Sequence, residues 1–350
     1  MPRFTGRPAA EFDFRDILYE KKNWVATVTI NRPQVYNSYS TLALQEMTQA
    51  FHDAAWDDNV AVVVLTGTGE RAFCTGGDVK EYATDYTQRP RDYWKWMGIY
   101  AECHQALLNI GKPTIARLNG MVVGGGNEFN MACDLAIAAE HVVIQQVGTR
   151  VGSVAAGGAT QWLPIIVGDR RAREILYLCE PIPAQKALEW GLINQVVPSL
   201  MGEGGAPITD PQQKAEALKN LSRARIDLRP LDEAVAIMAH KLIDKFPECT
   251  RYTKQQVNFW KDMAWYQTIG HARDWLSVHF SSLEPYEGMT AFVEKRAAGY
   301  RELREKAAAG GSSEFLWGPY TQTCPQCGSK GIPQGFKYCG LCGASLVEGK

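Results

Sequence analysis

The fold can be inferred from one stretch of the chain, Arg117-Leu-Asn-Gly-Met-Val-Val-Gly-Gly-Gly-Asn-Glu-Phe-Asn-Met-Ala-Cys-Asp134. It begins within an apolar run, Thr114 to Leu118, which predicts a buried strand. Three glycines follow, Gly124 to Gly126, and a segment compatible with a helix begins near Glu128. Consecutive glycines let a ligand approach bare N–H groups, and a helix start directs further N–H donors to the same place. The stretch therefore predicts a site that stabilises a negatively charged oxygen beside a carboxylate.

The glycine triplet alone has a plainer interpretation, as a flexible loop or a tight packing point. No Gly-Lys-Ser/Thr follows it, and it lacks the spacing of a dinucleotide-binding fingerprint. A second stretch, Arg71-Ala-Phe-Cys-Thr-Gly-Gly-Asp-Val-Lys-Glu81, repeats the arrangement after the apolar run Val60 to Leu65. We name residues 75–78 the first glycine turn and residues 124–126 the second glycine turn. Two such turns could supply two converging N–H donors.

Both glycine turns resemble those of the enoyl-CoA hydratase (crotonase) superfamily, and the resemblance extends over roughly residues 14–300. Further matching segments occur in the order of the family: Ile30–Pro33 with Asn37, Val151–Ser153, Gly157–Gln161, Gly168–Ile175, Ala184–Val197 and Glu287–Arg296. The resemblance implies an α/β fold of the crotonase type, a β-spiral of ββα repeats. It also implies a helical C-terminal region that builds trimers and often hexamers.

Members of this superfamily bind acyl-CoA thioesters and pass through an enolate of the thioester carbonyl. By resemblance, the two N–H donors that stabilise the enolate belong to Gly77, just before Asp78, and to Gly125. The hydratases use two glutamates, and Glu128 matches the first. A carboxylate near a helix N-terminus is also favoured by the helix dipole, an interpretation compatible with catalysis.

Further substrate-binding candidates follow from the resemblance. Lys80, Phe292 and Lys295 match family positions near the CoA moiety, and each has an alternative as a solvated or packed residue. Asp78 and Ser153 are substrate-binding candidates as well. No cofactor is expected for catalysis, because CoA is part of the substrate.

The chain departs from the hydratases at the second glutamate, where Gly148 stands. The segment Gln145 to Ser153 is similar instead to the naphthoyl-CoA synthase and ketocyclohexanecarboxyl-CoA hydrolase branch. That branch carries Asp a little after the serine, whereas this chain has Ala155 and Ala156. The branch also commonly lacks the equivalent of Glu128. The sequence therefore fits neither a simple hydratase nor a ring-closing synthase.

Over its whole length the chain is most similar to the ring-opening hydrolases of 6-oxocyclohex-1-ene-1-carbonyl-CoA, which act in anaerobic benzoyl-CoA degradation. These hydrolases add water to the ring alkene and then cleave the adjacent C–C bond, giving 3-hydroxypimeloyl-CoA. Glu128 would activate water or return a proton, and Gly148 would leave space for the ring or for the second water. Two alternatives remain open: an enoyl-CoA hydratase or isomerase with another substrate, and a non-catalytic interaction module.

Composition and charge limit the possible partners. Lys plus Arg number 37 against 38 Asp plus Glu in 350 residues, so no charge excess favours nucleic acid or an anionic membrane. The N-terminus lacks the apolar core of a signal peptide, and no apolar run reaches the ~18 residues of a transmembrane helix. We therefore expect a cytoplasmic protein with neither nucleic acid nor membrane as a partner. The resemblance implies a homotrimer or homohexamer with an acyl-CoA substrate.

Alternating apolar runs predict the secondary structure. Strands are expected at residues 24–30, 60–66, 114–118, 142–146 and 193–197. Helices are expected at 41–55, capped by Ser40, and at 92–109. The expected domains are a β-spiral core (1–200), an insertion (201–228), a helical C-terminal region (229–306), a linker (307–322) and a four-cysteine segment (323–350). Aromatic residues of the helical region are expected in the core or an oligomer interface rather than at the substrate.

The nine cysteines fall into two groups. Five are scattered through apolar surroundings and are expected to be reduced and buried: Cys74, Cys103, Cys133, Cys179 and Cys249. The other four form Cys324-Pro-Gln-Cys327-Gly and Cys339-Gly-Leu-Cys342-Gly. Disulfides are one interpretation, but two Cys-x-x-Cys-Gly knuckles in a reducing compartment favour one structural zinc ion in a small ribbon.

Overall fold

The computed structural model describes residues 6–202, 204–311 and 321–347. Residue 203 of the expected insertion, residues 312–320 of the expected linker and residues 348–350 of the four-cysteine segment lie outside the described residues. The chain divides into two compact units. The first comprises Met1–Asp78, Lys95–Thr149 and Val154–Arg273, and the second comprises Val79–Trp94, Arg150–Ser153 and Asp274–Lys350.

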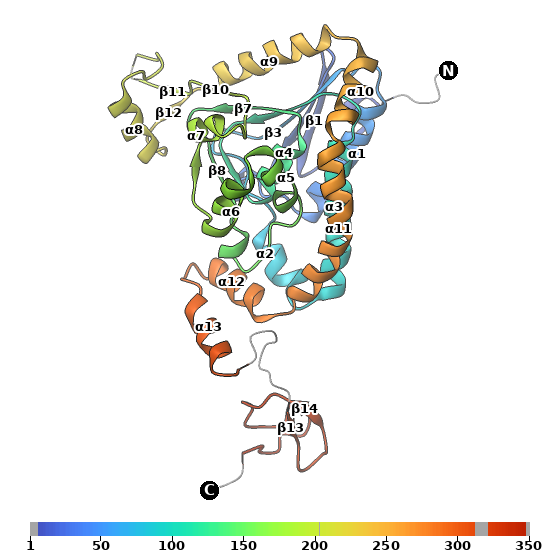
Figure 1. Cartoon of the computed structure of the whole chain (residues 1–350), viewed down its shortest axis with the longest axis vertical. Helices are drawn as coiled ribbons and strands as arrows, with labels where there is room; N and C mark the ends of the chain where they lie inside the picture. Colours follow the sequence, from blue (N-terminus) through green and yellow to red (C-terminus); the bar gives the residue numbers. More distant parts are fainter. Residues whose placement is uncertain (1–5, 203, 312–320, 348–350) are drawn as a thin grey trace. The chain divides into compact units, whose positions relative to one another are not determined.

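A six-stranded sheet forms the centre of the first unit (Figure 1). Its strands lie in the order β1 (Ile17–Lys22), β2 (Val25–Ile30), β3 (Val62–Gly67), β5 (Thr114–Leu118), β7 (Leu135–Ala139) and β10 (Gln195–Val197). Strands β1 and β2 form an antiparallel hairpin, and all the other pairs are parallel. All residues of β3 are buried, as expected for a parallel strand covered on both faces.

A second, four-stranded sheet contains β4 (Ala72–Cys74), β6 (Met121–Val123), β8 (Val143–Gln145) and β9 (Ile182–Pro183). Strands β4, β6 and β8 are parallel, and β9 is antiparallel to β8. Each strand of the large sheet from β3 to β7 is followed by a strand of the small sheet and then by a helix. This repetition is the ββα spiral that the resemblance implied.

The helices of the first unit are α1 (Thr41–Trp56), α4 (Gly125–Ala132), α5 (Ala159–Ile166), α6 (Asp169–Leu178), α7 (Ala184–Glu189), α8 (Pro211–Lys219), α9 (Arg229–Ile243) and α10 (Pro247–Val257). Helix α9 packs across β3, β5 and β7. The Ser40 hydroxyl accepts a hydrogen bond from the N–H of Ala43 at 3.0 Å, which confirms the predicted cap of α1. Two short strands, β11 (Leu200–Met201) and β12 (Arg225–Ile226), flank α8.

Two long helices contribute to both units, α3 (Pro90–Leu108) and α11 (Phe259–His279). The second unit also contains α2 (Val79–Glu81), a π-helical turn (Tyr82–Tyr86), α12 (Leu283–Val293), α13 (Tyr300–Ala308), β13 (Gln322–Thr323) and β14 (Lys330–Ile332). Within this unit the rings of Tyr93 and Phe280 stack at 3.7 Å, and the carbonyl of Phe280 accepts from the N–H of Gln88. The aromatic residues of α11 divide between environments, since Trp265 is fully buried whereas Trp260 is 59% exposed.

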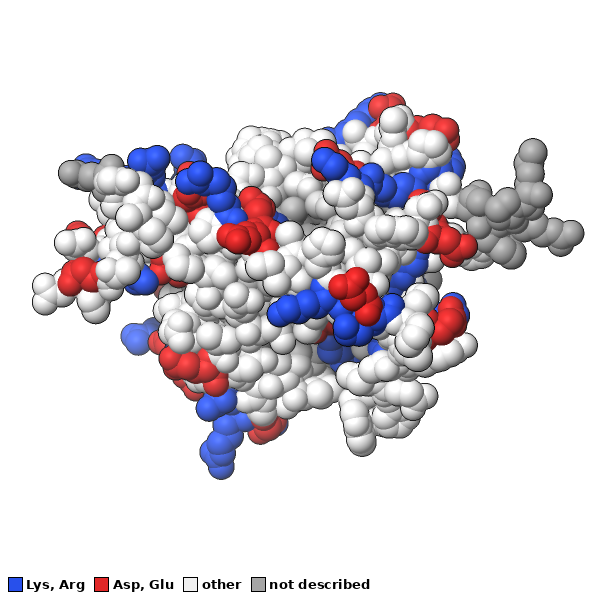
Figure 2. Space-filling view, turned by 90° about the horizontal axis from the view of Figure 1, so that it is seen from above, with Lys and Arg blue, Asp and Glu red and all other residues white. Residues whose placement is uncertain are grey.

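The surface carries charges of both signs. Figure 2 shows lysine and arginine side chains interspersed with aspartate and glutamate on the visible face, without a large patch of one sign. Among the described residues, no helix combines the length and apolar character needed to cross a membrane. The expectation of burial was wrong for Cys249, which is exposed in the first turn of α10, while Cys74, Cys103, Cys133 and Cys179 are buried.

Candidate active site

The two glycine turns lie side by side. The first follows β4, and a parallel bridge joins Gly77 to Tyr39. In this bridge the N–H of Tyr39 donates to Gly76 at 2.9 Å, and its carbonyl accepts from the N–H of Asp78 at 3.0 Å. The N–H of Gly77, between these two bonds, therefore points away from the Tyr39 segment.

Glycine is required where the two turns approach each other. A Cβ atom on Gly76 would lie 3.2 Å from the backbone nitrogen of Gly125, and Gly76 has a positive φ of 90°. A Cβ atom on Gly126 would lie only 2.0 Å from the carbonyl oxygen of Cys74, at the end of β4. Helix α4 begins at Gly125, whose N–H therefore has no acceptor within the helix. Two half-buried backbone N–H groups, those of Gly77 and Gly125, are thus brought to one place.

Glu128 is held by two hydrogen bonds in the first turn of α4. The side chain is 5% exposed. Its Oε1 accepts from the N–H of Ala159 at 3.2 Å, and its Oε2 accepts from the Tyr100 hydroxyl. Burial raises the pKa of the Glu128 carboxyl, and the bonds from Tyr100 and Ala159 oppose that rise. A carboxyl with a raised pKa is suited to exchange protons near neutral pH.

Tyr100 can accommodate both protonation states of Glu128. Its hydroxyl also lies 2.9 Å from the carbonyl oxygen of Gly157. When Glu128 is ionised, the hydroxyl donates to the carboxylate. When Glu128 is protonated, the carboxyl can donate to the hydroxyl oxygen, and the hydroxyl can turn to donate to Gly157. The single hydroxyl proton of Tyr100 thus goes to Glu128 in the ionised state and to Gly157 in the protonated state.

The segment Gly157–Gly158 makes this arrangement possible. A Cβ atom on Gly157 would lie 2.3 Å from the Tyr100 ring, and one on Gly158 would lie 3.3 Å from the Cβ of Glu128. Gly158 has a positive φ of 137° and precedes α5, whose first residue is Ala159. The carboxylate of Glu128 therefore lies at the N-terminus of α5, where the helix dipole favours negative charge.

Aromatic rings surround this carboxylate. The ring of Tyr100 lies 5.9 Å from that of Tyr39 and 4.1 Å from that of His104, and His104 stacks on Phe129 at 4.0 Å. Burial lowers the pKa of His104 to about 3, so this imidazole is neutral at physiological pH. Burial also raises the pKa of the Cys74 thiol to about 12, which makes a thiolate nucleophile there unfavourable. Glu128 is therefore the titratable group of this region best suited to proton transfer.

Other residues predicted for the site lie in different environments. The Asp78 carboxylate accepts from Arg32 at 3.0 Å, so it forms an ion pair within the first unit. Gly148 begins a 3-10 turn three residues after β8, whose Gln145 carbonyl accepts from the N–H of Gly124. Lys80, Ser153, Phe292 and Lys295 belong to the second unit, where Lys80, Phe292 and Lys295 are exposed and Ser153 is half-buried.

Tyr39 and Tyr100 were not predicted from the sequence. Tyr100 lies in the aromatic segment Tyr93 to Tyr100 of α3, whose composition is typical of packing residues. A Cβ atom on Gly125 would lie 2.0 Å from the Tyr39 hydroxyl, so this side chain covers the second glycine turn. Only contacts between distant parts of the chain distinguish these tyrosines from the other aromatic residues.

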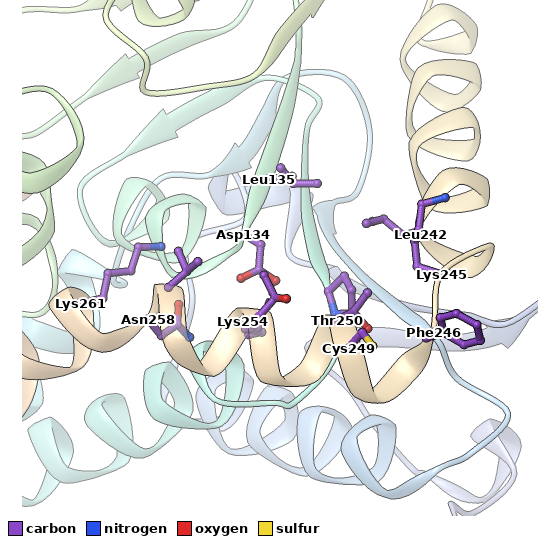
Figure 3. A pocket seen from close by; sticks show the side chains of 13 residues that line it. Asp134, Leu135, Leu242, Lys245, Phe246, Cys249, Thr250, Lys254, Asn258 and Lys261 are labelled. Carbon is purple, nitrogen blue, oxygen red and sulfur yellow. Dashed lines mark hydrogen bonds and ion pairs between the residues drawn. The ribbon is translucent and has the colours of Figure 1, made fainter.

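A separate pocket of about 450 Å³ lies beside α9 and α10 (Figure 3). Its lining includes Leu242, Phe246, Cys249 and Thr250 but neither glycine turn nor Glu128. Lys254 of α10 and Asp134 point towards each other in this pocket, with 2.9 Å between Nζ and Oδ2. Lys261 donates instead to the carbonyl of Met131 at 2.7 Å, near the C-terminal end of α4.

We expect the Asp134–Lys254 pair to contribute substantially to stability. Lys254→Met would leave the carboxylate, which has 23% side-chain exposure, with only the two donors of Thr114. The expected loss is about 3 kcal/mol in the free energy of unfolding, measured by urea denaturation. Arg173→Ala, which removes an exposed pair with Asp169 on α6, should cause no measurable change. Equal stabilities of the two variants would contradict this expectation.

One cysteine cluster in the second unit could hold a metal ion. Among the described residues, one group of three or more histidine, cysteine or acidic side chains has its ligand atoms close enough together for a metal ion. It consists of Cys324, Cys327, Cys339 and Cys342, whose sulfur atoms lie within 4.8 Å of one another. Glu128 belongs to no such group among the described residues.

Comparisons with known proteins agree on one family. A family model described as enoyl-CoA hydratase/isomerase matches residues 20–203. A 6-oxocyclohex-1-ene-1-carbonyl-CoA hydrolase of Geobacter metallireducens is 35% identical over 327 residues, which cover 87% of this chain and 84% of the relative. The Thauera aromatica protein of the same name is 35% identical over 309 residues, covering 81% and 82%. A solved enoyl-CoA hydratase from Mycobacterium avium subsp. paratuberculosis shares the fold, with a TM-score of 0.65, 24% identity and coverage of 82% and 99%.

Proposed function

The chain belongs to the enoyl-CoA hydratase/isomerase family, and on this basis we propose that it is a ring-opening hydrolase of 6-oxocyclohex-1-ene-1-carbonyl-CoA. It is an enzyme that acts on an acyl-CoA. We choose this substrate because both relatives are named 6-oxocyclohex-1-ene-1-carbonyl-CoA hydrolase. The product would be 3-hydroxypimeloyl-CoA.

Both steps of the proposed reaction place negative charge on the same oxygen. In the first step, water adds to the ring alkene at the carbon β to the thioester, the electron pair of the alkene moves onto the thioester carbonyl, and the α-carbon then takes a proton. In the second step, water attacks the ring ketone, the bond between the ketone carbon and the α-carbon breaks, and its electron pair forms the same thioester enolate. The ketone carbon becomes a carboxylate and the α-carbon takes a proton.

The two glycine turns suit this chemistry. The N–H groups of Gly77 and Gly125 would donate to the thioester oxygen, and each such donor is worth about 3 kcal/mol in the transition state. Because the enolate oxygen is the same in both steps, one pair of donors would serve the hydration and the ring opening.

Glu128 would move the protons in both steps. Its carboxylate would take a proton from the attacking water and return one to the α-carbon. The hydroxyl of Tyr100 would position this carboxylate and stabilise it in either protonation state, through the alternative bonds to Glu128 and Gly157. Tyr100 is therefore proposed as a positioning residue.

Substrate turnover tests the proposed function. The purified protein should convert 6-oxocyclohex-1-ene-1-carbonyl-CoA with a kcat/KM at least ~100-fold above that for crotonyl-CoA, since a site shaped for one acyl group discriminates through differential transition-state binding. Efficient hydration of crotonyl-CoA together with no turnover of the cyclic thioester would instead support an ordinary hydratase.

Tyr100→Phe should shift the pH dependence of kcat/KM. The hydrogen bond from Tyr100 lowers the pKa of Glu128, so removing it should raise that pKa further above its usual range. If the ionised carboxylate acts as the base, the acid limb of the profile must move to higher pH. Tyr266→Phe, which alters an exposed residue of α11, is the control and should leave the profile unchanged. An unshifted limb in Tyr100→Phe would remove this residue from the mechanism.

The effect of Gly148→Glu on turnover should distinguish a ring-opening hydrolase from a hydratase, because the two functions predict opposite changes. If Gly148 leaves space for the substrate ring, a glutamate side chain should abolish turnover of the cyclic thioester. If the chain is a hydratase that lacks its second carboxylate, the same change should increase the hydration of crotonyl-CoA. Gly148→Ala is the control for backbone effects. A Glu variant that gains crotonyl-CoA hydration would contradict the ring-opening function.

We also propose that the chain assembles as a trimer or a hexamer. Phe246, directly before α10, is 80% exposed, Val257 at the end of α10 is 70% exposed, and Trp260 of α11 is 59% exposed. Exposed apolar side chains concentrated on neighbouring segments are typical of subunit interfaces. Light scattering on the purified protein should give three or six times the 38.9 kDa chain mass, and a monomer at micromolar concentration would contradict this proposal.

A further inference from the structure

Residues 321–347 form two turns that repeat one hydrogen-bonding pattern. In the first, the N–H of Cys324 donates to Ser329 at 2.8 Å and the N–H of Gly328 donates to Cys324 at 3.0 Å. In the second, Cys339 donates to Ala344 at 2.8 Å and Gly343 to Cys339 at 2.9 Å. Gly328 and Gly343 both have a φ of 73°, so each Cys-x-x-Cys-Gly knuckle closes with a glycine in the left-handed region.

The repeated turns bring four sulfur atoms together. The Sγ atoms of Cys324 and Cys342 are 3.6 Å apart, and those of Cys327 and Cys339 are 3.7 Å apart. A tetrahedral zinc ion with Zn–S bonds of ~2.3 Å requires neighbouring sulfurs to be about 3.8 Å apart. A disulfide instead requires about 2.05 Å. The four thiols therefore have the spacing of a metal site and not that of two disulfides.

The segment has too small an apolar core to fold by hydrophobic burial alone. Its buried residues are Cys324, Ile332 and Cys339, with Ala344 and Leu346 packed against them. The larger apolar side chains of the segment lie outside this core, since Leu341 is 81% exposed and Tyr338 is 66% exposed. Domains of this size usually require disulfides or a metal ion, and two of the three buried residues are the first cysteines of the knuckles.

We propose that Cys324, Cys327, Cys339 and Cys342 bind one zinc ion per chain and that this ion holds the C-terminal segment in its fold. Four thiolates complete a tetrahedral coordination shell, so no position remains for water or substrate, and the site is structural rather than catalytic. Iron can also occupy a tetrahedral four-sulfur site. Zinc(II) binds a given set of ligands more tightly than iron(II), and this favours zinc.

Metal analysis of the full-length protein tests this site independently of any enzymatic activity. Protein purified under reducing conditions should contain about one zinc per chain and negligible iron. Cys327→Ser and Cys342→Ser each replace an exposed cysteine, one from each knuckle, and both should lower the zinc content severalfold. Cys249→Ser replaces an exposed cysteine outside the cluster and should retain the zinc of the parent protein.

Two further measurements identify the coordination and its structural effect. Replacement of zinc by cobalt(II) should give the intense visible absorption of tetrahedral thiolate coordination, and Cys327→Ser should weaken it. Hydrogen exchange of the backbone amides of residues 324–344 should be slow in the metal-loaded parent and fast after metal removal. The proposal is overturned by protein that contains no zinc, by iron in its place, by disulfides among these cysteines, or by zinc that persists in both serine variants.

Discussion

Glu128→Gln should fold and bind acyl-CoA thioesters but turn over the cyclic substrate at least ~100-fold more slowly, because general acid/base catalysis contributes about this much. The amide can keep an acceptor for the N–H of Ala159 and cannot exchange a proton with water or with the substrate carbon. Steady-state kcat and a binding constant for a non-reactive CoA thioester should be measured together. A near-normal kcat would remove Glu128 from proton transfer.

The thermal stability of Glu128→Gln is a control for correct folding, and the direction of its change can be predicted. Burial raises the folded-state pKa of Glu128 above its unfolded value. Ionisation of this carboxyl therefore costs folding free energy as the pH rises from the unfolded pKa through the folded one. The neutral amide removes that cost, so the Tm of Glu128→Gln should equal or exceed that of the parent at neutral pH. The difference should disappear at acidic pH, below the unfolded pKa. A large loss of Tm at neutral pH would mean that reduced turnover reflects unfolding.

Gly126→Ala should also lower kcat by about 100-fold or more, since it forces the two glycine turns apart. The added methyl group would lie 2.0 Å from the carbonyl oxygen of Cys74, which is backbone and cannot rotate away. Any shift that relieves this contact moves Gly125 relative to Gly77, and loss of one aligned oxyanion donor costs about 100-fold to 1000-fold in kcat.

Gly270→Ala is the matched control for this substitution. Gly270 lies in α11, and a Cβ atom there would meet nothing within 4 Å. The alanine should leave kcat unchanged and should stabilise the helix by up to about 1 kcal/mol. Normal turnover by Gly126→Ala would show that the separation of the turns does not control catalysis.

The sequence predicted the parts of the fold that have strong local signals. The strands at 24–30, 60–66 and 114–118 are confirmed as β2, β3 and β5, because long apolar runs favour buried parallel strands. The glycine turns were also predicted, because two stretches of the chain repeat the order of apolar run, glycines and helix-compatible segment. The strand expected at 142–146 is confirmed as β8 (Val143–Gln145), whereas β4 and β6 of the small sheet, each only three residues long, were not predicted from local pattern. Strand β1 was missed because half of its residues are charged, as expected for the outer strand of a hairpin.

The candidate site was predicted only in part, for a related reason. Glu128, Gly77 and Gly125 lie in motifs that the sequence contains in full. Tyr100 is 28 residues from Glu128 along the chain, and their contact depends on the packing of α3 against α4 and on the small size of Gly157. The exposure of Cys249 likewise depends on which face of α10 is covered. Such contacts arise from tertiary structure, and no local pattern encodes them.

The central claim is that one site adds water twice to a cyclic acyl-CoA, and an isotope experiment tests it most directly. The enzyme would be incubated with 6-oxocyclohex-1-ene-1-carbonyl-CoA in water enriched in oxygen-18, and the products would be fragmented in a mass spectrometer. We predict an open-chain hydroxy-dicarboxylic thioester with one labelled oxygen in its hydroxyl group and one in its new carboxylate. A product that remains cyclic and has gained only one labelled water would contradict ring opening and identify the enzyme as a hydratase.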